Sequence, residues 1–358
     1  MFKNIKEKII SFFLRLLKFK KVAKKNIWKR LKENREYITI LAPMLDVTDR
    51  PFREIVAELG APDLFFTEFV SIDGLASEKG RKRLEVMLKA SSYEKRNKNL
   101  ILQIFGSNPE KVSKAFEVIN KYNFSGIDIN MGCPDKKIIK QGAGSGMMRD
   151  FESARKIFEA VKKETFLPVS IKTRLGYSKI DWEWIRFVLS LKPDALTFHL
   201  RTTKEMSRVP AHWEVVKKIR ELRDEISPET ILVGNGDLEG LKEAEEKVLE
   251  SCIDGVMIGR GIFKNPALFA REDFGLWDKK KKFQILIRHG NLFEEEFGGL
   301  GKNYKKFGKR LKSFNLMKKF FKIYLNGFDG TKELRVKLME MKNWEEIKKE
   351  IRNIYWSK

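Results

Sequence analysis

The 358-residue sequence predicts an α/β protein, in which a (β/α)8 TIM barrel is followed by a C-terminal all-helical domain and preceded by a basic N-terminal helical extension. Eight short apolar runs alternate with amphipathic helical stretches between residues 37 and 270, which is typical of repeated βα units around a parallel sheet. Eight units in about 235 residues also match the usual size of such a barrel. No strand pattern follows residue 270, so residues 271–358 are expected to form the helical domain.

The extension, residues 1–36, is expected to be helical. Apolar residues of the segment 3–32 recur every three or four positions, with lysines between them. Arg15 interrupts the apolar stretch, so the segment is not expected to cross a membrane. It could pack on the barrel, lie on a lipid surface or contact RNA. Packing on the barrel is favoured by a small margin, and membrane contact has no support.

The barrel domain, residues 37–270, has helices with clear capping signals between most of its strands. Asp49 and Pro51 open one helix, which Gly60 closes. Asn108 followed by Pro109 opens another. The eight expected strands cover residues 37–42, 63–68, 100–105, 126–130, 168–173, 194–199, 230–234 and 254–258.

The net charge of +24 is concentrated at the two ends of the chain. Residues 1–36 contain 13 Lys and Arg against 3 acids, and residues 271–358 contain 23 against 12. The barrel domain is nearly neutral, with 37 against 34. Two basic ends suit a polyanion that spans the molecule, although lysines on solvated helix faces would give the same composition. Together with the site described below, this pattern favours a nucleic acid as partner.

The sequence holds two cysteines and three histidines. Two distant cysteines cannot build a disulfide framework, and no signal-peptide pattern is present, so the expected compartment is a reducing cytoplasm. The histidines have no paired cysteine or carboxylate spacing. No metal site is therefore expected.

Polar residues stand at the expected carboxyl ends of most strands. In a barrel of parallel strands these ends meet at one rim, so the side chains are expected to gather there. Buried polar groups without partners cost a few kcal/mol each, so such a ring implies a ligand, water or mutual hydrogen bonds. The residues are Gln103, Asn130, Cys133, Lys172, Arg174, His199, Arg201, Asn235, Asp237 and Arg260.

The last two strands end in Val233-Gly-Asn-Gly-Asp237 and Val256-Met-Ile-Gly-Arg260. Loops after strands seven and eight of TIM barrels commonly hold a phosphate, because glycines expose backbone N–H groups there. Arg260 adds a guanidinium group for the same anion. Either loop alone could simply turn the chain, but both together favour a phosphorylated cofactor.

Lys172 and Gln103 suit a flavin ring. A cation beside a flavin stabilises the negative charge that gathers on the ring during reduction. The amide of Gln103 offers a donor and an acceptor for the edge of the ring. Lys172 could instead pair with a neighbouring carboxylate, and a glutamine on a strand often faces solvent.

Cys133 is the candidate reagent. The stretch Gly126-Ile-Asp-Ile-Asn-Met-Gly-Cys-Pro134 runs from a buried strand into a tight loop at the rim. Buried, inert cysteines are more common, but this loop position favours a functional thiol. Cys252, at a helix end before an expected strand, is expected to be structural.

With these residues in this order, the chain resembles the tRNA-dihydrouridine synthases. The resemblance covers the barrel, roughly residues 37–270, and a similar helical tail follows the barrel in that family. It rests on Ala42-Pro-Met44, Thr48-Asp-Arg-Pro-Phe-Arg53, Gln103, Asn130-Met-Gly-Cys-Pro134, Lys172-Thr-Arg174, His199, Arg201-Thr202, Asn235-Gly-Asp237 and Gly259-Arg260.

The resemblance implies an FMN-binding barrel that reduces the C5=C6 bond of particular uridines in tRNA, with NADPH or NADH re-reducing the flavin. It implies that Cys133 protonates C5 while FMN N5 delivers a hydride to C6. Asn130, Arg174 and Arg201 would contact the substrate, and the basic helical domain would hold the tRNA backbone. The flavin would be bound by Pro43, Met44, Leu45, Gln103, Lys172, His199, Asn235, Gly236, Asp237, Gly259 and Arg260.

Four residues depart from the family pattern: Leu45, Asp46, Leu200 and His212. They leave the flavin assignment intact, but the modified uridine is not predicted. Two other functions remain open. One is a flavin barrel that acts on a small molecule, as dihydroorotate dehydrogenases do, and the basic tail and the context of Cys133 disfavour it. The other is a non-catalytic RNA-binding barrel, which the complete set of polar residues at the strand ends disfavours.

Overall fold

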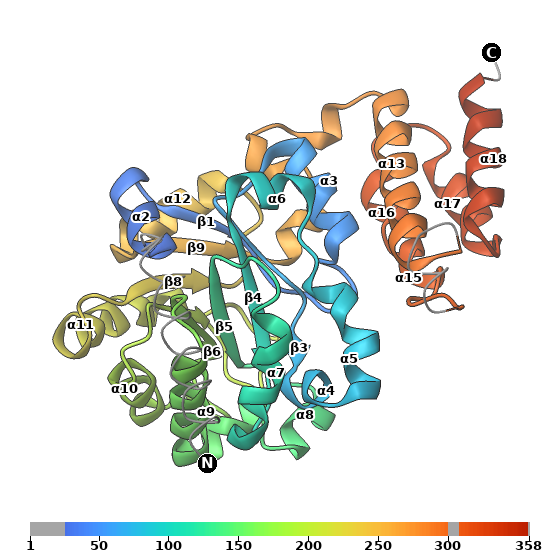
Figure 1. The fold of residues 1–358 in the computed structure, drawn as a ribbon. Coiled ribbons are helices and arrows are strands. Elements are labelled where there is room, and N and C mark those ends of the chain that lie inside the picture. Colours follow the sequence, from blue (N-terminus) through green and yellow to red (C-terminus); the bar gives the residue numbers. More distant parts are fainter. Residues whose placement is uncertain (1–25, 300–307, 357–358) are drawn as a thin grey trace.

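The computed structural model describes residues 26–299 and 308–356. Within these residues nine parallel strands form one closed sheet, with helices around it (Figure 1). The first strand, β1, pairs with β2 on one side and with β9 on the other, and β2 also pairs with β4. The closed parallel sheet confirms the predicted (β/α)8 barrel. The strands are β1 Ile38–Leu41, β2 Leu64–Phe66, β3 Val70–Ser71, β4 Leu100–Phe105, β5 Gly126–Met131, β6 Val169–Arg174, β7 Ala195–His199, β8 Ile231–Asn235 and β9 Gly255–Ile258.

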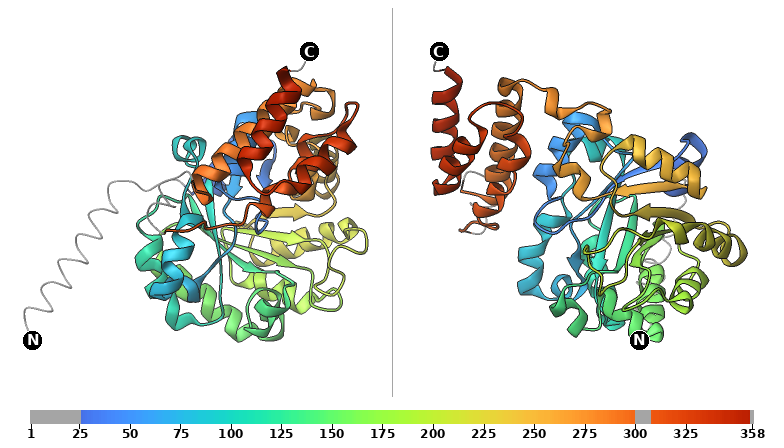
Figure 2. Two further views of the ribbon diagram at one scale, coloured as in Figure 1. Left: turned by 90° about the vertical axis from the view of Figure 1, so that its right-hand side faces the viewer. Right: turned by 180° about the vertical axis from the view of Figure 1, so that it is seen from behind.

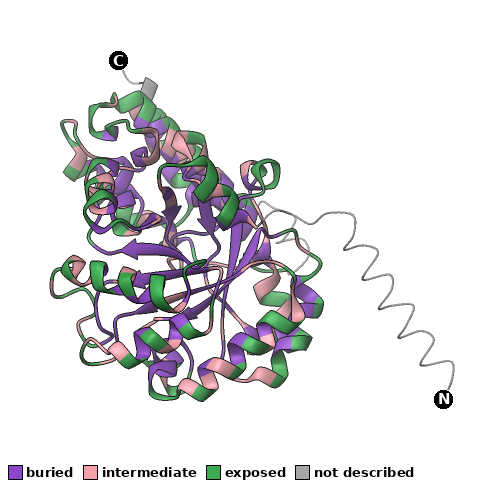
Figure 3. Ribbon diagram, turned by 90° about the vertical axis from the view of Figure 1, so that its left-hand side faces the viewer, coloured by how far each residue is buried: buried purple, intermediate pink, exposed green. Residues whose placement is uncertain are grey.

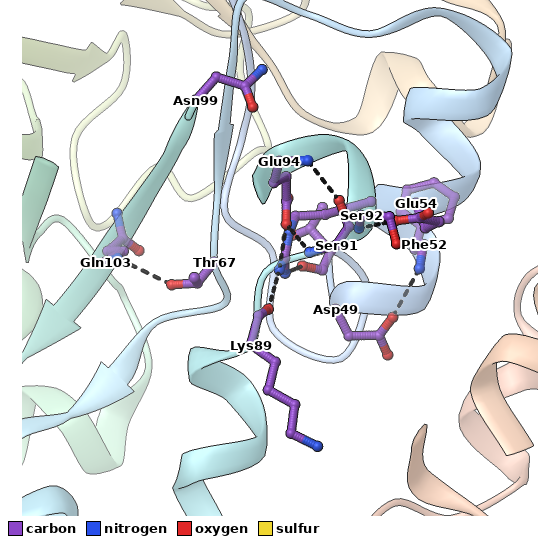
Figure 4. Close-up of polar contacts among 12 residues, drawn as sticks. Asp49, Phe52, Glu54, Thr67, Lys89, Ser91, Ser92, Glu94, Asn99 and Gln103 are labelled. Atoms are coloured by element: carbon purple, nitrogen blue, oxygen red, sulfur yellow. Dashed lines mark hydrogen bonds and ion pairs between the residues drawn. The ribbon is translucent and has the colours of Figure 1, made fainter. Parts of the chain in front are cut away.

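The second strand of the barrel is interrupted. The expected strand 63–68 is shorter in the structure, and a separate two-residue strand, β3, follows it and pairs with the same neighbour, β4. The reason lies at Thr67, whose hydroxyl group accepts the backbone N–H of Gln103 at 3.1 Å in place of a main-chain carbonyl (Figure 4). The ladder of backbone hydrogen bonds therefore breaks at this point.

The helices begin and end largely where the capping signals predict. Asp49 accepts the backbone N–H of Phe52 and caps α3, which ends at Gly60. Asn108 caps a 3-10 turn, Pro109–Lys111, before α7 begins. The helices of the barrel domain are α3 Arg50–Gly60, α4 Ile72–Ala76, α5 Glu78–Leu84, α6 Ser92–Asn97, α7 Val112–Ile119, α8 Lys136–Lys140, α9 Phe151–Glu164, α10 Trp182–Ser190, α11 Val216–Ile226 and α12 Leu241–Ser251.

The interior of the barrel has an apolar floor. Ile38, Ile40, Phe66 and Val233 belong to one buried cluster inside the strands. Trp28, which is fully buried, joins this cluster from helix α2, Ile27–Asn34. Helix α2 therefore packs against the barrel, which agrees with the favoured expectation for this part of the extension alone. Figure 3 shows the buried strands surrounded by helices whose outer faces are exposed.

The expectation of one continuous helix over residues 3–32 is wrong at Asn26, and residues 1–25 lie outside the described part of the chain. Asn26 has non-helical backbone angles and caps α2 by accepting the N–H of Trp28 at 3.0 Å. Its amide also donates to Asp194 at 2.6 Å, so this residue fastens the start of α2 to the barrel.

Among the described residues, helices and no strands follow β9, as predicted. They are α13 Lys279–Phe297, α15 Asn315–Lys318, α16 Phe321–Tyr324, α17 Thr331–Glu340 and α18 Trp344–Trp356. Figures 1 and 2 show them on one side of the barrel, next to α3. Phe52 of α3 packs against Phe320 and His289 of the helical region, with ring centroids 5.0 and 5.6 Å apart. The hydrophobic core is thus continuous between the two parts. The domain boundaries after residues 36 and 270 stay predictions.

Candidate active site

A cavity of ≈ 440 Å³ opens at the carboxyl ends of the barrel strands. This volume lies within the range of cofactor and ligand sites, roughly 300–1,000 Å³. Polar side chains therefore gather at this rim, as expected from the βα topology. Of the predicted site residues, the cavity is lined by Pro43, Met44, Asn130, Cys133, Lys172, Arg174, His199, Asn235, Gly236, Asp237, Gly259 and Arg260.

Three predicted site residues are not part of the cavity wall. Leu45 is exposed to solvent beside Met44. Gln103 is fully buried inside the barrel, and its side chain bonds Asp128 and Asn130. Arg201 is also buried and bonds Val209 and Asp237. The roles assigned to these three residues stay predictions.

The Cys133 loop is held by hydrogen bonds on both sides. The side-chain oxygen of Asn130 accepts the backbone N–H groups of Gly132 and Cys133 at 3.1 and 2.9 Å. The carbonyl of Cys133 accepts the N–H and the hydroxyl of Ser145. Gly144 has φ +58°, and a Cβ there would stand 2.9 Å from the Cys133 carbonyl oxygen. Glycine is therefore needed for this close approach.

The thiol of Cys133 is partly buried, and this sets its protonation. Burial is the largest effect on the pKa of the Cys133 thiol and raises it. The backbone N–H of Asp135 lowers this pKa, whereas the negative charge of Asp135 raises it. The positive charges of Arg174 and Lys172 also lower it, without cancelling the effect of burial. The group is therefore a protonated thiol at neutral pH, as a proton donor must be.

Lys172 and Arg174 extend from β6 toward the same cavity. The ammonium group of Lys172 donates to the side-chain oxygen of Asn235 at 3.1 Å. Burial and the nearby Arg174 lower the pKa of Lys172 to about 8, while Asp128 opposes the shift. Arg174 donates to the carbonyls of Gly132, Thr202 and Met206, so it links the Cys133 loop to the loop after β7.

The glycine-rich ends of β8 and β9 form the other wall. Gly236 has φ +145°, and Asp237 stands in the left-handed region with φ +52°. The carboxylate of Asp237 accepts hydrogen bonds from Arg201, Arg260 and the backbone of Ala211. Although burial opposes it, pairing with Arg201 holds the pKa of Asp237 below its usual range. The carboxylate of Asp237 therefore orients the guanidinium groups of Arg201 and Arg260 at the predicted phosphate site.

The residues present fit a flavin mononucleotide. The ring nitrogen Nδ1 of His199 and Nη1 of Arg201 are buried without a partner among the described residues. Burial and the nearby cations of Arg174 and Lys172 keep the pKa of His199 well below its usual range, so the ring is neutral. At Gly259 a Cβ would meet Ala42 and Met44 at 3.7 and 3.8 Å, on the wall of the cavity. Of the two unpaired nitrogen atoms, that of His199 lies on the cavity wall. An unpaired ring nitrogen, the cations Lys172 and Arg260, and a glycine wall suit a phosphorylated aromatic ligand.

The cavity also has lining residues that were not predicted as site residues: Ala42, Phe69, Gly132, Pro134, Thr173, Leu238, Glu239, Met257, Gly261 and Lys264. Phe69 lines the cavity, but the strand that precedes it was expected to end at residue 68, and the bend at Thr67 has no sequence signal. Asp128 lies in β5, the strand that leads into the Cys133 loop, and is fully buried beneath the site. An acid inside an otherwise apolar strand pattern is the signal that could have identified it.

Groups of three or more metal-ligating side chains do not occur among the described residues. Within the same residues, no helix is long and apolar enough to span a membrane.

Comparison with known proteins now decides the family. The family model described as "Dihydrouridine synthase (Dus)" matches residues 40–356. The chain belongs to the dihydrouridine synthase family. It is 40% identical over 327 residues to a protein named "Probable tRNA-dihydrouridine synthase" of Staphylococcus aureus strain COL, covering 91% of this chain and 94% of that one. It is 38% identical over 329 residues to "Probable tRNA-dihydrouridine synthase 2" of Bacillus subtilis strain 168, covering 90% and 94%.

Membership of the dihydrouridine synthase family supports the predicted oxidoreductase with a flavin cofactor. Among solved structures, a histamine dehydrogenase from Rhizobium sp. 4-9 is similar with a TM-score of 0.50 and 13% identity, over 71% of this chain and 48% of that chain. A 6-hydroxypseudooxynicotine amine oxidase from Pseudomonas geniculata N1 also has a TM-score of 0.50, with 10% identity over 77% and 54%. At these identities the similarity shows the fold alone.

Proposed function

We propose that this dihydrouridine synthase reduces the C5=C6 bond of specific uridines in tRNA, with Cys133 as the proton donor and FMN as the bound cofactor. The observation that carries the proposal is the partly buried thiol of Cys133 at the rim of a cavity whose opposite wall has the cations and glycines that a phosphorylated cofactor needs. We further propose that NADPH, or NADH, re-reduces the flavin.

Different residues of the cavity wall would bind the flavin ring and its phosphate. Met44 and Pro43 provide an apolar surface for the flavin ring, and Lys172 provides a positive charge at its edge. Asn235 orients Lys172 through their 3.1 Å hydrogen bond. Arg260 and the glycines of the loops after β8 and β9 bind the phosphate.

When bound, FMN supplies the hydride that C6 of the uracil ring receives. Cys133 donates its proton to C5, so the ring gains one hydride and one proton, and solvent then returns a proton to the thiolate. A uridine reaches this cavity only after leaving its stack, which costs little in a single-stranded loop. The hydrogen bonds that hold the Cys133 loop fix the position of the thiol at the rim of the cavity.

The decisive measurement is mass spectrometry of tRNA that lacks dihydrouridine, before and after incubation with the holoenzyme and NADPH. Wild-type protein should add 2 Da to specific uridines. Cys133→Ala should lower the rate of product formation by about 10²–10⁴-fold, the usual contribution of a general acid, while NADPH still reduces the bound flavin. Cys252→Asn is the matched control, because Cys252 is exposed and has a left-handed backbone that asparagine tolerates. An unchanged rate in Cys133→Ala would remove the proposed role of this thiol.

A further inference from the structure

Beneath the candidate active site lies a layer of polar side chains inside the barrel. Gln103, Asp128 and Ser170 occupy matching positions on β4, β5 and β6. All three are buried, and Asp128 is completely inaccessible to solvent. An ionised carboxylate in such a place costs several kcal/mol of desolvation, so its presence calls for an explanation.

The carboxylate of Asp128 is satisfied by two donors. The side-chain nitrogen of Gln103 donates to one oxygen at 2.7 Å, and the hydroxyl group of Ser170 donates to the other at 2.7 Å. Burial raises the pKa of Asp128 to about 6, which leaves it mostly ionised at neutral pH. An ionised carboxylate only accepts hydrogen bonds, so it forces the nitrogen of the Gln103 amide toward itself.

The orientation of this amide is transmitted to the Cys133 loop. With its nitrogen on Asp128, Gln103 turns its oxygen to the amide nitrogen of Asn130, which donates to it at 3.0 Å. The oxygen of Asn130 must then face the other way, where it accepts the N–H groups of Gly132 and Cys133. One buried charge therefore fixes the direction of two successive amides that end at the reactive thiol.

We propose that Asp128 is a positioning residue of the reductase, which acts through Gln103 and Asn130 to hold the Cys133 loop in its reactive conformation. This inference rests on the proposed function of Cys133. Simple filling of the barrel interior does not explain the charge, because asparagine has the same shape. An asparagine could accept from Gln103 and donate to Ser170 without the cost of a buried charge, but it could also present its nitrogen to Gln103. Only a carboxylate excludes the reversed arrangement.

The test uses the reactivity of the thiol as a readout that is independent of turnover. In a Cys252→Asn background Cys133 is the one remaining cysteine of the sequence, so its alkylation by iodoacetamide can be followed directly in flavin-free and FMN-loaded protein. Asp128→Leu should change the alkylation rate of Cys133 at least threefold. It should also lower kcat by about 10²-fold, as a misplacement of about 1 Å does, with little change in the KM for tRNA.

Ser170→Ala is the matched control. It removes the other hydrogen bond of the same carboxylate at an equally buried position, but it leaves the path from Asp128 to Cys133 intact. Its kcat and alkylation rate should stay within about twofold of wild type, although its melting temperature falls, since a buried hydrogen bond is lost. The proposal would be wrong if Asp128→Leu lowered only the melting temperature and kept both kcat and the alkylation rate of Cys133 within twofold of wild type.

A double substitution keeps the test decisive if Asp128→Leu does not fold. In Asp128→Asn combined with Gln103→Glu, the carboxylate moves to position 103 and can accept from Asn130 directly. The alkylation rate of Cys133 should return to within about threefold of wild type, whereas Gln103→Glu alone places two carboxyl groups side by side and should not. Failure of the double variant to restore the rate overturns the proposal. Failure of the proposed function itself would be recognised separately, because the unsubstituted protein would then form no dihydrouridine.

Discussion

At the scale of single residues, the site depends on the protonation of one thiol. The pKa of Cys133 is raised because burial, helped by the negative charge of Asp135, outweighs the groups that lower it. These groups are the backbone N–H of Asp135 and the positive charges of Arg174 and Lys172. A raised pKa keeps the proton on sulfur at the pH of the cell, which favours proton donation over nucleophilic attack. The same sulfur with a lowered pKa would be a thiolate and could not serve as the acid.

This protonation can be measured through the pH dependence of alkylation. In the Cys252→Asn background, the alkylation rate of Cys133 should rise with pH to a midpoint above the ordinary cysteine value of about 8.5. Asp135→Asn should lower the midpoint, because it removes a negative charge but keeps a side chain that can cap α8. Lys172→Met should raise it, because a positive charge near the thiolate is lost. A midpoint well below 8.5 in the otherwise unchanged protein would contradict proton donation by Cys133.

At the scale of elements, the apolar runs were sufficient to place the strands, and the capping residues placed the helix starts. The structure departs from these predictions where a side chain takes the place of a backbone hydrogen-bond partner. Thr67 interrupts the second strand because its hydroxyl group takes the N–H of Gln103. Gln103 itself was expected at the flavin, but the paired acid that holds its amide, Asp128, lies 25 positions later and is visible only in three dimensions.

The contact between the barrel and the helical region could not be predicted either, because its partners are far apart in the sequence and meet only in three dimensions. Lys312 of the helical region lies within 3.5 Å of three carboxylates of the barrel, those of Asp46, Asp49 and Glu68. Asp49 and Glu68 are almost completely buried, and burial raises the pKa of both. The loop that carries Asp46 also carries Met44, which lines the cavity. Lys312 therefore links the helical region to the barrel next to the site, together with Lys319, which donates to the backbone carbonyl of Asp46.

Lys312→Met should destabilise the protein by about 3–5 kcal/mol at neutral pH, because it leaves buried carboxylates without their cation. A carboxyl group whose pKa is higher in the folded than in the unfolded state contributes stability at low pH and loses it as the pH rises through the folded-state pKa. The deficit of the variant should consequently shrink as the pH is lowered from 7 toward 5. Chemical denaturation at several pH values measures this. Lys82→Met, which removes an exposed ion pair with Glu78, is the control and should have little effect. A deficit independent of pH would contradict the assigned role of the two acids.

At the scale of the whole molecule, charge and architecture agree. The barrel provides a nearly neutral body with the cavity, and the region after it carries 23 Lys and Arg against 12 acids. Figure 2 shows the helical region next to the barrel, and its side chains pack against α3. The first turn of α3 follows the Asp46 loop at the rim of the barrel. A polyanion bound along the helical region would thus pass close to the cavity. We propose that this region holds the tRNA backbone while one uridine enters the site.

Removal of the entire helical region would not test this proposal cleanly, because Phe52 and its neighbours would lose part of their core. Single exposed lysines are a better probe. The double variant Lys309→Ala and Lys322→Ala should weaken tRNA binding and reduce the slope of log K against log salt by about 1–2, since each phosphate contact contributes about 0.7–0.9. The matched control is Lys163→Ala with Lys217→Ala, two exposed lysines of α9 and α11 on the side of the barrel away from the helical region (Figure 1). Titration of tRNA at several salt concentrations compares the two pairs. Equal slopes for both double variants would place the RNA-binding surface elsewhere on the molecule.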